Sequence, residues 1–207
     1  VEYRFMKHAR LPAAHEDAVR ALQFIRSKAD DWGIDKKRIA AYGGSAGAQL
    51  VAYLAWGDDF ADPESDDPIA RESTRLTAVA PLAGQSTMDL DWWEANIPGY
   101  RKTFHKNDRS EFDLSEVEMR ALRNELSIIT HISSDDPPTF MSYGMKPDDQ
   151  IPENPKRARG WSIHHVNFGI VMEEKLRRAG VEVHLKYPQI TLPFENDVVF
   201  LIHHLKK

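Results

Sequence analysis

The sequence predicts an α/β fold in which a mostly parallel β-sheet carries helices on both faces. Short apolar segments of strand length alternate along the chain with longer segments of helical periodicity. These helical segments are long enough to connect parallel strands, which a two-residue turn cannot do. One of them, residues 46–56, is apolar nearly all round, as expected for a helix packed inside a protein.

Each element follows from its local pattern. Residues 1–5 alternate apolar and polar side chains like a strand, and residues 12–33 place alanine, leucine and isoleucine on one helical face before a stop at Gly33. Residues 38–43 form a short apolar run of the kind found in buried strands. By the same criteria the other predicted strands are residues 76–84, 137–144 and 181–188, and the other predicted helices are residues 114–126, 170–180 and 194–207.

Composition narrows the class of protein. The chain has 207 residues, of which 42% are hydrophobic, and this suits one globular domain with a sizeable core. A net charge of -5 argues against a nucleic-acid partner, and the absence of cysteine excludes disulfides and thiolate metal sites. No stretch approaches the roughly 20 apolar residues of a membrane span. We expect a soluble body, with no compartment indicated, since any targeting segment would lie upstream of Val1.

A glycine-rich motif stands at one strand-to-helix junction. The segment "AAYGGSAGAQL" places Ser45 between the strand predicted at 38–43 and the helix predicted at 46–56. Such a turn strains its apex residue, and small neighbours let strand and helix pass closely. The apex hydroxyl then lies beside the helix amides, beginning with the N–H of Ala46, where an oxyanion would form. Ser45 is therefore a candidate nucleophile; the alternative is a glycine-rich turn that binds a phosphate or nothing.

The whole chain, residues 1–207, is expected to form one domain with a partly helical, cap-like insertion at residues 85–136. Two aromatic residues in this insertion, Trp92 and Trp93, could form an apolar or sugar-stacking wall above a substrate, with Gly44 beside it. The alternative is that the tryptophans are the small core of the insertion itself.

Several segments occur together in an order known from one family. They are "VEYRF", "LPAAHEDAVRALQFIR" and "AAYGGSAGAQLVAYLA", followed later by "ISSDDPPTFMSYG". In these segments the chain resembles α/β-hydrolases of the esterase/lipase type, close to the acetyl-ester and carboxylesterase branch. That family has a Y-R strand, a P-A-x-x-E-D-A helix, a G-G-S-A-G turn at its nucleophile, and a D-P-P strand before its catalytic acid. The resemblance begins at Val1 and weakens after Tyr187.

The resemblance also implies a catalytic acid. In the family, a G-x-x-D-x-x-V-P-like loop presents it after the D-P-P strand. Here the loop reads "GMKPDDQIP" and is one residue longer, so Asp148 matches when counted back from Pro152, and Asp149 is the second choice. This loop is expected at the sheet edge where Ser45 emerges. The alternative is that both are solvated loop carboxylates.

The histidine departs from the family pattern. The family has it between the last strand and the last helix, but that loop, "PQITLPFEN", contains none. The best substitutes are His164 and His165, in "RGWSIHHVNFG" after the acid loop. Adjacent side chains point in different directions, so at most one is expected to face Ser45. The alternative is that both cap or pack the helix that follows.

The N-terminal part also departs from the pattern. The family's H-G-G-type loop, which supplies further oxyanion donors, has no counterpart here, nor has a strand between those matched by residues 1–5 and 38–43. A missing interior strand would leave unpaired backbone groups. We therefore expect the chain to be the C-terminal part of a longer protein, or to rearrange or form a homo-oligomer that closes the gap. Losing one oxyanion donor typically costs about a hundred- to a thousandfold in rate.

Taken with these departures, the resemblance implies a serine hydrolase that cleaves short-chain acyl or acetyl esters through an acyl-enzyme. Ser45 would attack while His165 or His164 takes its proton. Asp148 would orient that histidine, and the Ala46 N–H would hold the oxyanion. No cofactor or metal is needed, and the partner would be a small-molecule ester, acylated carbohydrates included. The alternatives are a catalytically impaired relative that acts as a binding protein, and a peptidase of the same fold.

Overall fold

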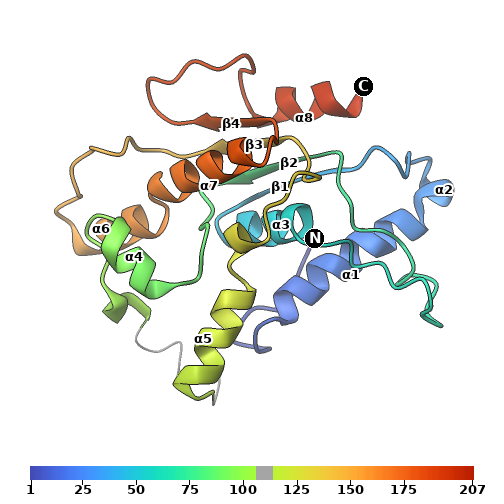
Figure 1. The fold of residues 1–207 in the computed structure, drawn as a ribbon, viewed down its shortest axis with the longest axis horizontal. Coiled ribbons are helices and arrows are strands. Elements are labelled where there is room, and N and C mark those ends of the chain that lie inside the picture. Colours follow the sequence, from blue (N-terminus) through green and yellow to red (C-terminus); the bar gives the residue numbers. More distant parts are fainter. Residues whose placement is uncertain (106–113) are drawn as a thin grey trace.

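Parallel strands form one sheet in the residues that the computed structural model describes, 1–105 and 114–207. The four strands pair in the order β1-β2-β3-β4, so that neighbours along the chain are neighbours in the sheet (Figure 1). The register places Ala40 of the first strand opposite Ala78 of the second. The predicted parallel sheet is therefore confirmed. The strands are β1 (Ala40–Gly44), β2 (Ala78–Leu82), β3 (Thr139–Ser142) and β4 (Val183–Lys186).

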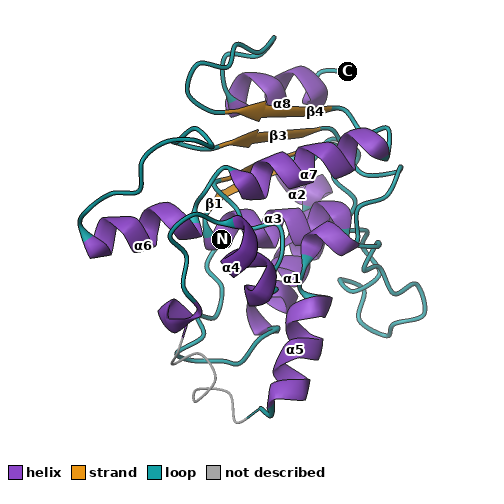
Figure 2. Ribbon diagram, turned by 60° about the vertical axis from the view of Figure 1, so that its left-hand side comes forward, coloured by secondary structure: helices purple, strands orange, loops and turns teal. Residues whose placement is uncertain are grey.

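Helices cover both faces of this sheet, as predicted. On one face lie α3 and α7, with α1 beyond α3, and α8 covers the other face (Figure 2). The helix predicted at residues 12–33 is divided in two at Lys28, and the second part ends at Gly33, whose φ is 66°. These helices are α1 (Ala13–Ser27), α2 (Ala29–Trp32), α3 (Ala46–Trp56), α7 (Asn167–Arg178) and α8 (Asp197–Leu205). No helix in the described ranges has the length and hydropathy that crossing a membrane requires.

The long connection from β2 to β3 is partly helical where it is described, as predicted. The helix predicted at residues 114–126 is confirmed as α5, which begins with a capping box between Ser115 and Glu118. The elements of this connection are α4 (Leu90–Asn96), the 3-10 helix η1 (Lys102–His105), α5 (Glu116–Glu125) and the 3-10 helix η2 (Ile128–Thr130). After β3, the chain forms α6 (Pro155–Ile163) before it enters α7.

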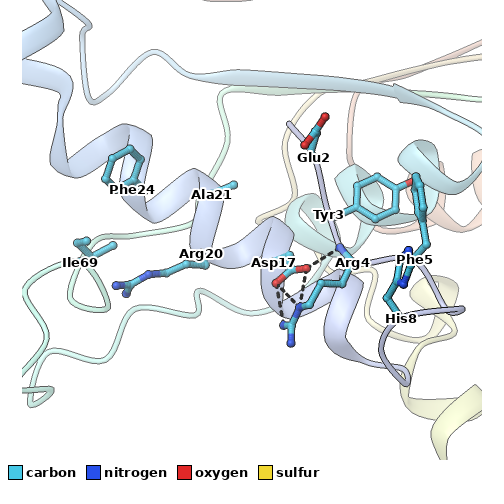
Figure 3. A pocket seen from close by; sticks show the side chains of 10 residues that line it. All are labelled: Glu2, Tyr3, Arg4, Phe5, His8, Asp17, Arg20, Ala21, Phe24 and Ile69. Carbon is cyan, nitrogen blue, oxygen red and sulfur yellow. Dashed lines mark hydrogen bonds and ion pairs between the residues drawn. The ribbon is translucent and has the colours of Figure 1, made fainter.

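The N-terminal segment does not form the strand predicted for residues 1–5. It runs beside α1, where the backbone N–H of Arg4 donates to Asp17 at 2.8 Å. An alternating pattern forms a strand only when a neighbouring strand pairs with its backbone, and among the described residues β1 pairs with β2 alone. Instead, this segment and α1 line an open hollow of about 900 Å³ (Figure 3). The sheet ends at β1, where Tyr42 is 67% exposed.

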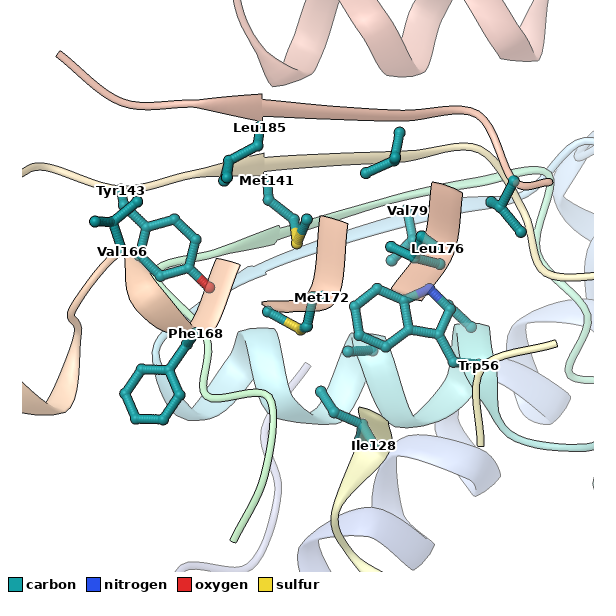
Figure 4. Packing of buried hydrophobic residues seen from close by; sticks show 14 of the residues in the cluster. Trp56, Val79, Ile128, Met141, Tyr143, Val166, Phe168, Met172, Leu176 and Leu185 are labelled. Atoms are coloured by element: carbon teal, nitrogen blue, oxygen red, sulfur yellow. The ribbon is translucent and has the colours of Figure 1, made fainter. Parts of the chain in front are cut away.

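The main core lies between the sheet and the helices α3 and α7. Trp56 of α3 and Met172 and Leu176 of α7 pack beneath the strands (Figure 4). Val79 of β2 and Met141 of β3 contribute the strand side of this cluster, and both are fully buried. Burying such side chains is the dominant favourable term in folding. The core thereby fixes the carboxyl edge of the sheet, where the candidate site lies.

Candidate active site

Ser45 occupies the turn between β1 and α3. Its φ of 53° and ψ of -117° lie in a region that costs a non-glycine residue about 1–3 kcal/mol. Gly43 allows the close approach that imposes this turn, because a Cβ at this position would lie 2.5 Å from the Gly47 carbonyl oxygen. The Ser45 N–H donates to the Leu82 carbonyl at 3.0 Å and ties the turn to β2. The exposed Ser45 hydroxyl therefore stands at the carboxyl edge of the sheet.

His164 is the histidine that meets this hydroxyl. Its Nε2 lies 2.8 Å from Ser45 Oγ, and its Nδ1 lies 2.8 Å from the carbonyl oxygen of Gly160. A carbonyl oxygen can only accept a hydrogen bond, so the Gly160 contact assigns the proton to Nδ1. Nε2 then carries the free lone pair and accepts the hydrogen bond from the Ser45 hydroxyl. A serine paired with an imidazole in this tautomer is chemically equipped for nucleophilic attack.

Helix α6 places His164 beside the turn. The Asn154 side chain caps the start of the helix by accepting hydrogen bonds from the Lys156 and Arg157 backbone N–H groups, and Pro155 occupies the first turn. His164 follows the last helical residue as the C-cap. The end of α6 therefore fixes the backbone position from which the His164 ring reaches Ser45.

His165 faces the opposite way, into the protein. It is fully buried and its ring packs edge-on against Trp161, with centroids 4.5 Å apart. Its Nδ1 accepts a hydrogen bond from the Asn167 backbone N–H at 3.2 Å, and burial lowers its pKa, an effect that Asp149 opposes. The structure therefore brings His164 and not His165 to Ser45.

The expected acid does not reach His164. Asp148 is exposed in the loop after β3, and Asp149 accepts a hydrogen bond from the Lys146 backbone N–H at 2.8 Å. Within the described residues, neither carboxylate forms a hydrogen bond or ion pair with His164, whose Nδ1 is occupied by Gly160. The helix itself supplies the acceptor for Nδ1, from four residues earlier in the chain. The carbonyl was missed from sequence, although the Asn154 and Pro155 pair is a recognisable helix start.

The start of α3 presents the Ala46 backbone N–H beside Ser45. Ala46 is exposed at the first position of α3, and in the described part of the chain its N–H has no hydrogen-bond acceptor. Gly44 ends β1 beside it and is also exposed. Amides at a helix N-terminus point at whatever lies before them, which here includes the space next to Ser45 Oγ.

The two tryptophans of the connection after β2 lie in different surroundings. Trp93 is 4% exposed, donates its Nε1–H to the Thr87 carbonyl at 2.6 Å, and packs edge-on against Phe168 of α7. Trp92 is half-buried and packs against the same core cluster. Trp93 therefore contributes its ring to the main core beside α7, and not to a separate small core of the insertion.

The hollow along α1 lies apart from Ser45. Ser45 is not among the residues lining the hollow along α1, where Arg4 pairs with Asp17 (Figure 3). Arg20 also lines this hollow and pairs with Asp67. In residues 1–105 and 114–207, no three histidine or carboxylate side chains are grouped as a metal ion would require. The reactive groups that the structure brings together are therefore Ser45, His164 and the Ala46 amide.

Sheet order, helix placement and the turn at Ser45 together define the α/β-hydrolase fold of esterases. The BD-FAE family model matches residues 1–157, and the chain belongs to this family. Among curated relatives, the chain is 29% identical over 170 residues to the esterase LipQ of Mycobacterium tuberculosis (strain ATCC 25618 / H37Rv). This alignment covers 81% of the chain and 38% of LipQ. An arylesterase of Saccharolobus solfataricus is 42% identical over 105 residues, covering 50% of the chain and 30% of that protein.

Solved structures support the same fold. An acetyl ester-xyloside bifunctional hydrolase from Caldicellulosiruptor lactoaceticus superimposes with a TM-score of 0.65 at 23% identity, covering 99% of this chain and 66% of that one. A truncated carbohydrate esterase from gut microbiota gives a TM-score of 0.68 at 16% identity, covering 100% and 73%. The chain thus spans well under half of the curated relatives and about two thirds or more of these two structures.

Proposed function

We propose that this chain carries the nucleophile and base of a serine carboxylic ester hydrolase. The observation that carries the proposal is the 2.8 Å contact between Ser45 Oγ and His164 Nε2 on a strained turn. The names of the esterase relatives and the membership of the BD-FAE family support the same reaction class.

In the proposed reaction, Ser45 Oγ attacks the ester carbonyl and its proton passes to His164 Nε2. The tetrahedral oxyanion is held by the Ala46 N–H, and its collapse expels the alcohol, which takes the proton from His164. The acyl group remains on Ser45 until a water molecule, deprotonated by His164, releases the carboxylic acid. The Gly160 carbonyl accepts the Nδ1–H of both the neutral and the protonated His164 ring, so that Nε2 is the nitrogen that gains and loses the proton. From sequence, Asp148 was expected to orient the histidine in this way.

The proposed substrates are short-chain acyl esters, acetyl esters of carbohydrates included. The printed names of two structural neighbours, an acetyl ester-xyloside hydrolase and a carbohydrate esterase, motivate this choice. Half-buried Trp92 and exposed Gly44 remain candidates for contacting the substrate, whereas buried Trp93 would act through packing.

The experiment is a chain-length series of 4-nitrophenyl esters, from acetate to octanoate, with the wild type, Ser45→Ala and the control Ser27→Ala. Ser27 is a serine at the end of α1 whose hydroxyl donates to the Phe24 carbonyl at 2.8 Å. We expect turnover that falls with acyl length, that is lost in Ser45→Ala and that is retained in Ser27→Ala. Equal turnover by Ser45→Ala and the wild type would refute the proposal.

A second candidate function is a binding protein that uses the same turn without turnover. It is favoured by one observation: within the described residues His164 contacts a carbonyl where an esterase would be expected to use a carboxylate. Saturable binding of an acetylated sugar by calorimetry, with no release of acetate, would support this candidate over the hydrolase.

A further inference from the structure

The carbonyl end of α6 makes a contact that ties it to the segment following β2. Ile163 is the last residue of α6 and directly precedes His164, and its carbonyl oxygen accepts a hydrogen bond from Gln85 Nε2 at 2.6 Å. The last carbonyls of a helix have no partner inside the helix and are satisfied from outside. Here one such carbonyl, that of Gly160, contacts His164, and another, that of Ile163, is held by Gln85.

The segment that bears Gln85 is itself firmly held at the edge of the sheet. The Ala83 N–H donates to the Ser142 carbonyl at 2.8 Å, and the buried Tyr143 hydroxyl donates to the Gly84 carbonyl at 2.6 Å. Ala83 has a φ of 50°, which turns the chain sharply as it leaves β2. The backbone that carries Gln85 is therefore held in place by the hydrogen bonds of Ala83 and Gly84.

The same segment also holds the nucleophile. The residue that ends β2, Leu82, accepts the hydrogen bond from the Ser45 N–H at 3.0 Å. A continuous path therefore runs from Ser45 through residues 82–85 to Ile163 and then His164. Its two ends are the groups that meet at 2.8 Å.

We propose that Gln85 is a positioning residue that holds His164 at hydrogen-bond distance from Ser45. This inference rests on the proposed hydrolase function and adds a residue to it. His165 is buried between α6 and α7, so its packing holds the connection between these helices. Gln85 holds the carbonyl of Ile163, the residue directly before His164. A displacement of about 1 Å in a reacting group can cost on the order of a hundredfold in rate, so one hydrogen bond next to His164 has a large effect.

The test replaces Gln85 with methionine, which keeps the length of the side chain and removes the donor. The matched control is Gln23→Met, because Gln23 also donates Nε2 to backbone carbonyls, those of Phe60 and Ala70, but far from His164 in the fold. We expect Gln85→Met to lower kcat on 4-nitrophenyl acetate by about ten- to a hundredfold with KM within about twofold. Gln23→Met should lower Tm and leave kcat within about twofold of the wild type.

Two further readouts keep the test decisive. Imidazole ¹⁵N shifts of His164 should report the Nδ1–H form in the wild type and tautomer exchange in Gln85→Met, whether or not ester is hydrolysed. In Gln85→Glu, the protonated carboxyl can donate to Ile163 and the ionised one cannot, so kcat relative to the wild type should fall as pH rises through the pKa of that carboxyl. Wild-type inactivity would refute the hydrolase function. Unchanged kcat and unchanged His164 shifts in Gln85→Met, or a pH-independent ratio in Gln85→Glu, would refute the positioning role.

Discussion

His164 and His165 are neighbours in the chain with opposite surroundings. The first is half-buried between Ser45 and the Gly160 carbonyl, and the second is fully buried against Trp161. A base must exchange protons with substrate and water, and only His164 has both a free Nε2 lone pair and access to the nucleophile.

This contrast predicts different effects of two substitutions. His164→Ala should lower kcat on 4-nitrophenyl acetate by about 10²–10⁴, the usual contribution of a general base. His165→Phe keeps the ring packing against Trp161 and should lower kcat by less than about tenfold while lowering Tm, because the Asn167 N–H loses its acceptor. Steady-state kinetics with thermal melts measures both. The assignment of the base would be contradicted if His165→Phe were the more damaging change in kcat.

At this scale the sequence identified the serine and left its partners open. The G-G-S-A-G motif predicts that Ser45 lies at the apex of a tight turn, because such a turn requires small residues on both sides of the serine. The choice between two adjacent histidines depends on where α6 ends, which no spacing rule supplies. The contact with Gly160 is a backbone interaction, so no residue type marks it, and Asp148 was expected in its place from the resemblance alone.

The close crossing of β1 and α3 is the element-level feature on which the site depends. Gly43 and Gly44 are adjacent in β1, but only the first faces the helix: a Cβ at Gly43 would meet the Gly47 backbone at 2.5 Å, and a Cβ at Gly44 would meet nothing within 4 Å. The close crossing that holds Ser45 in its strained conformation therefore requires that residue 43 has no side chain.

Gly43→Ala should destabilise the protein by about 1–3 kcal/mol or more, because strand and helix must separate to admit the methyl group. The same separation should displace Ser45 and lower kcat. Gly44→Ala provides the matched control and should leave the free energy of unfolding within about 0.5 kcal/mol, as for an unconstrained surface change. Urea denaturation of both variants measures this difference, and equal midpoints would show that the crossing does not require glycine.

Most elements could be predicted from the sequence because their hydrophobic period is set by burial. The strands β2 to β4 and the helices α3, α5 and α8 fall within the predicted segments, whereas β1 extends past its predicted segment to Gly44 and α7 begins before its predicted segment, at Asn167. The strand expected at residues 1–5 was wrong because pairing depends on a neighbour and not on the segment itself. Helix α6 was missed because its short, charged sequence shows little apolar periodicity, despite the Asn154 cap.

The stability of the whole molecule depends on a histidine that burial between α1 and α3 keeps neutral. His15 of α1 is 4% exposed and lies edge-on to Tyr53 of α3, with centroids 4.8 Å apart. Burial lowers its pKa to about 4, against an ordinary value of 6.5. At mildly acid pH, His15 is therefore protonated in the unfolded chain and neutral in the folded protein.

The resulting stability is fully present above pH 6.5 and is lost as pH falls toward 4, because below 6.5 the unfolded state gains protons first. The loss should approach about 3 kcal/mol from this group. His15→Phe keeps the ring contact with Tyr53 and removes the titration, so the wild type should lose more stability than the variant between pH 7 and pH 4. Urea midpoints at both pH values measure this, and parallel losses would contradict the buried neutral histidine.

The sheet edge at β1 is the other feature of the whole molecule. In the described residues β1 has one strand neighbour, and Tyr42 on it is 67% exposed. From sequence, a gap in the sheet was expected because the family has a strand before the one at residues 38–43 that has no counterpart here. The open edge lies at β1, beside the expected gap. The expectation that the chain is part of a longer protein stays a prediction.

If Ser45 is an activated nucleophile, as proposed, it should react covalently with an electrophilic phosphorus reagent. A fluorophosphonate should modify the wild type once, and peptide mass mapping should place the adduct on Ser45. His164→Ala should slow this labelling by about 10² or more, since the base that takes the hydroxyl proton is gone. An unmodified wild type, or an adduct on another residue that persists in Ser45→Ala, would contradict the account.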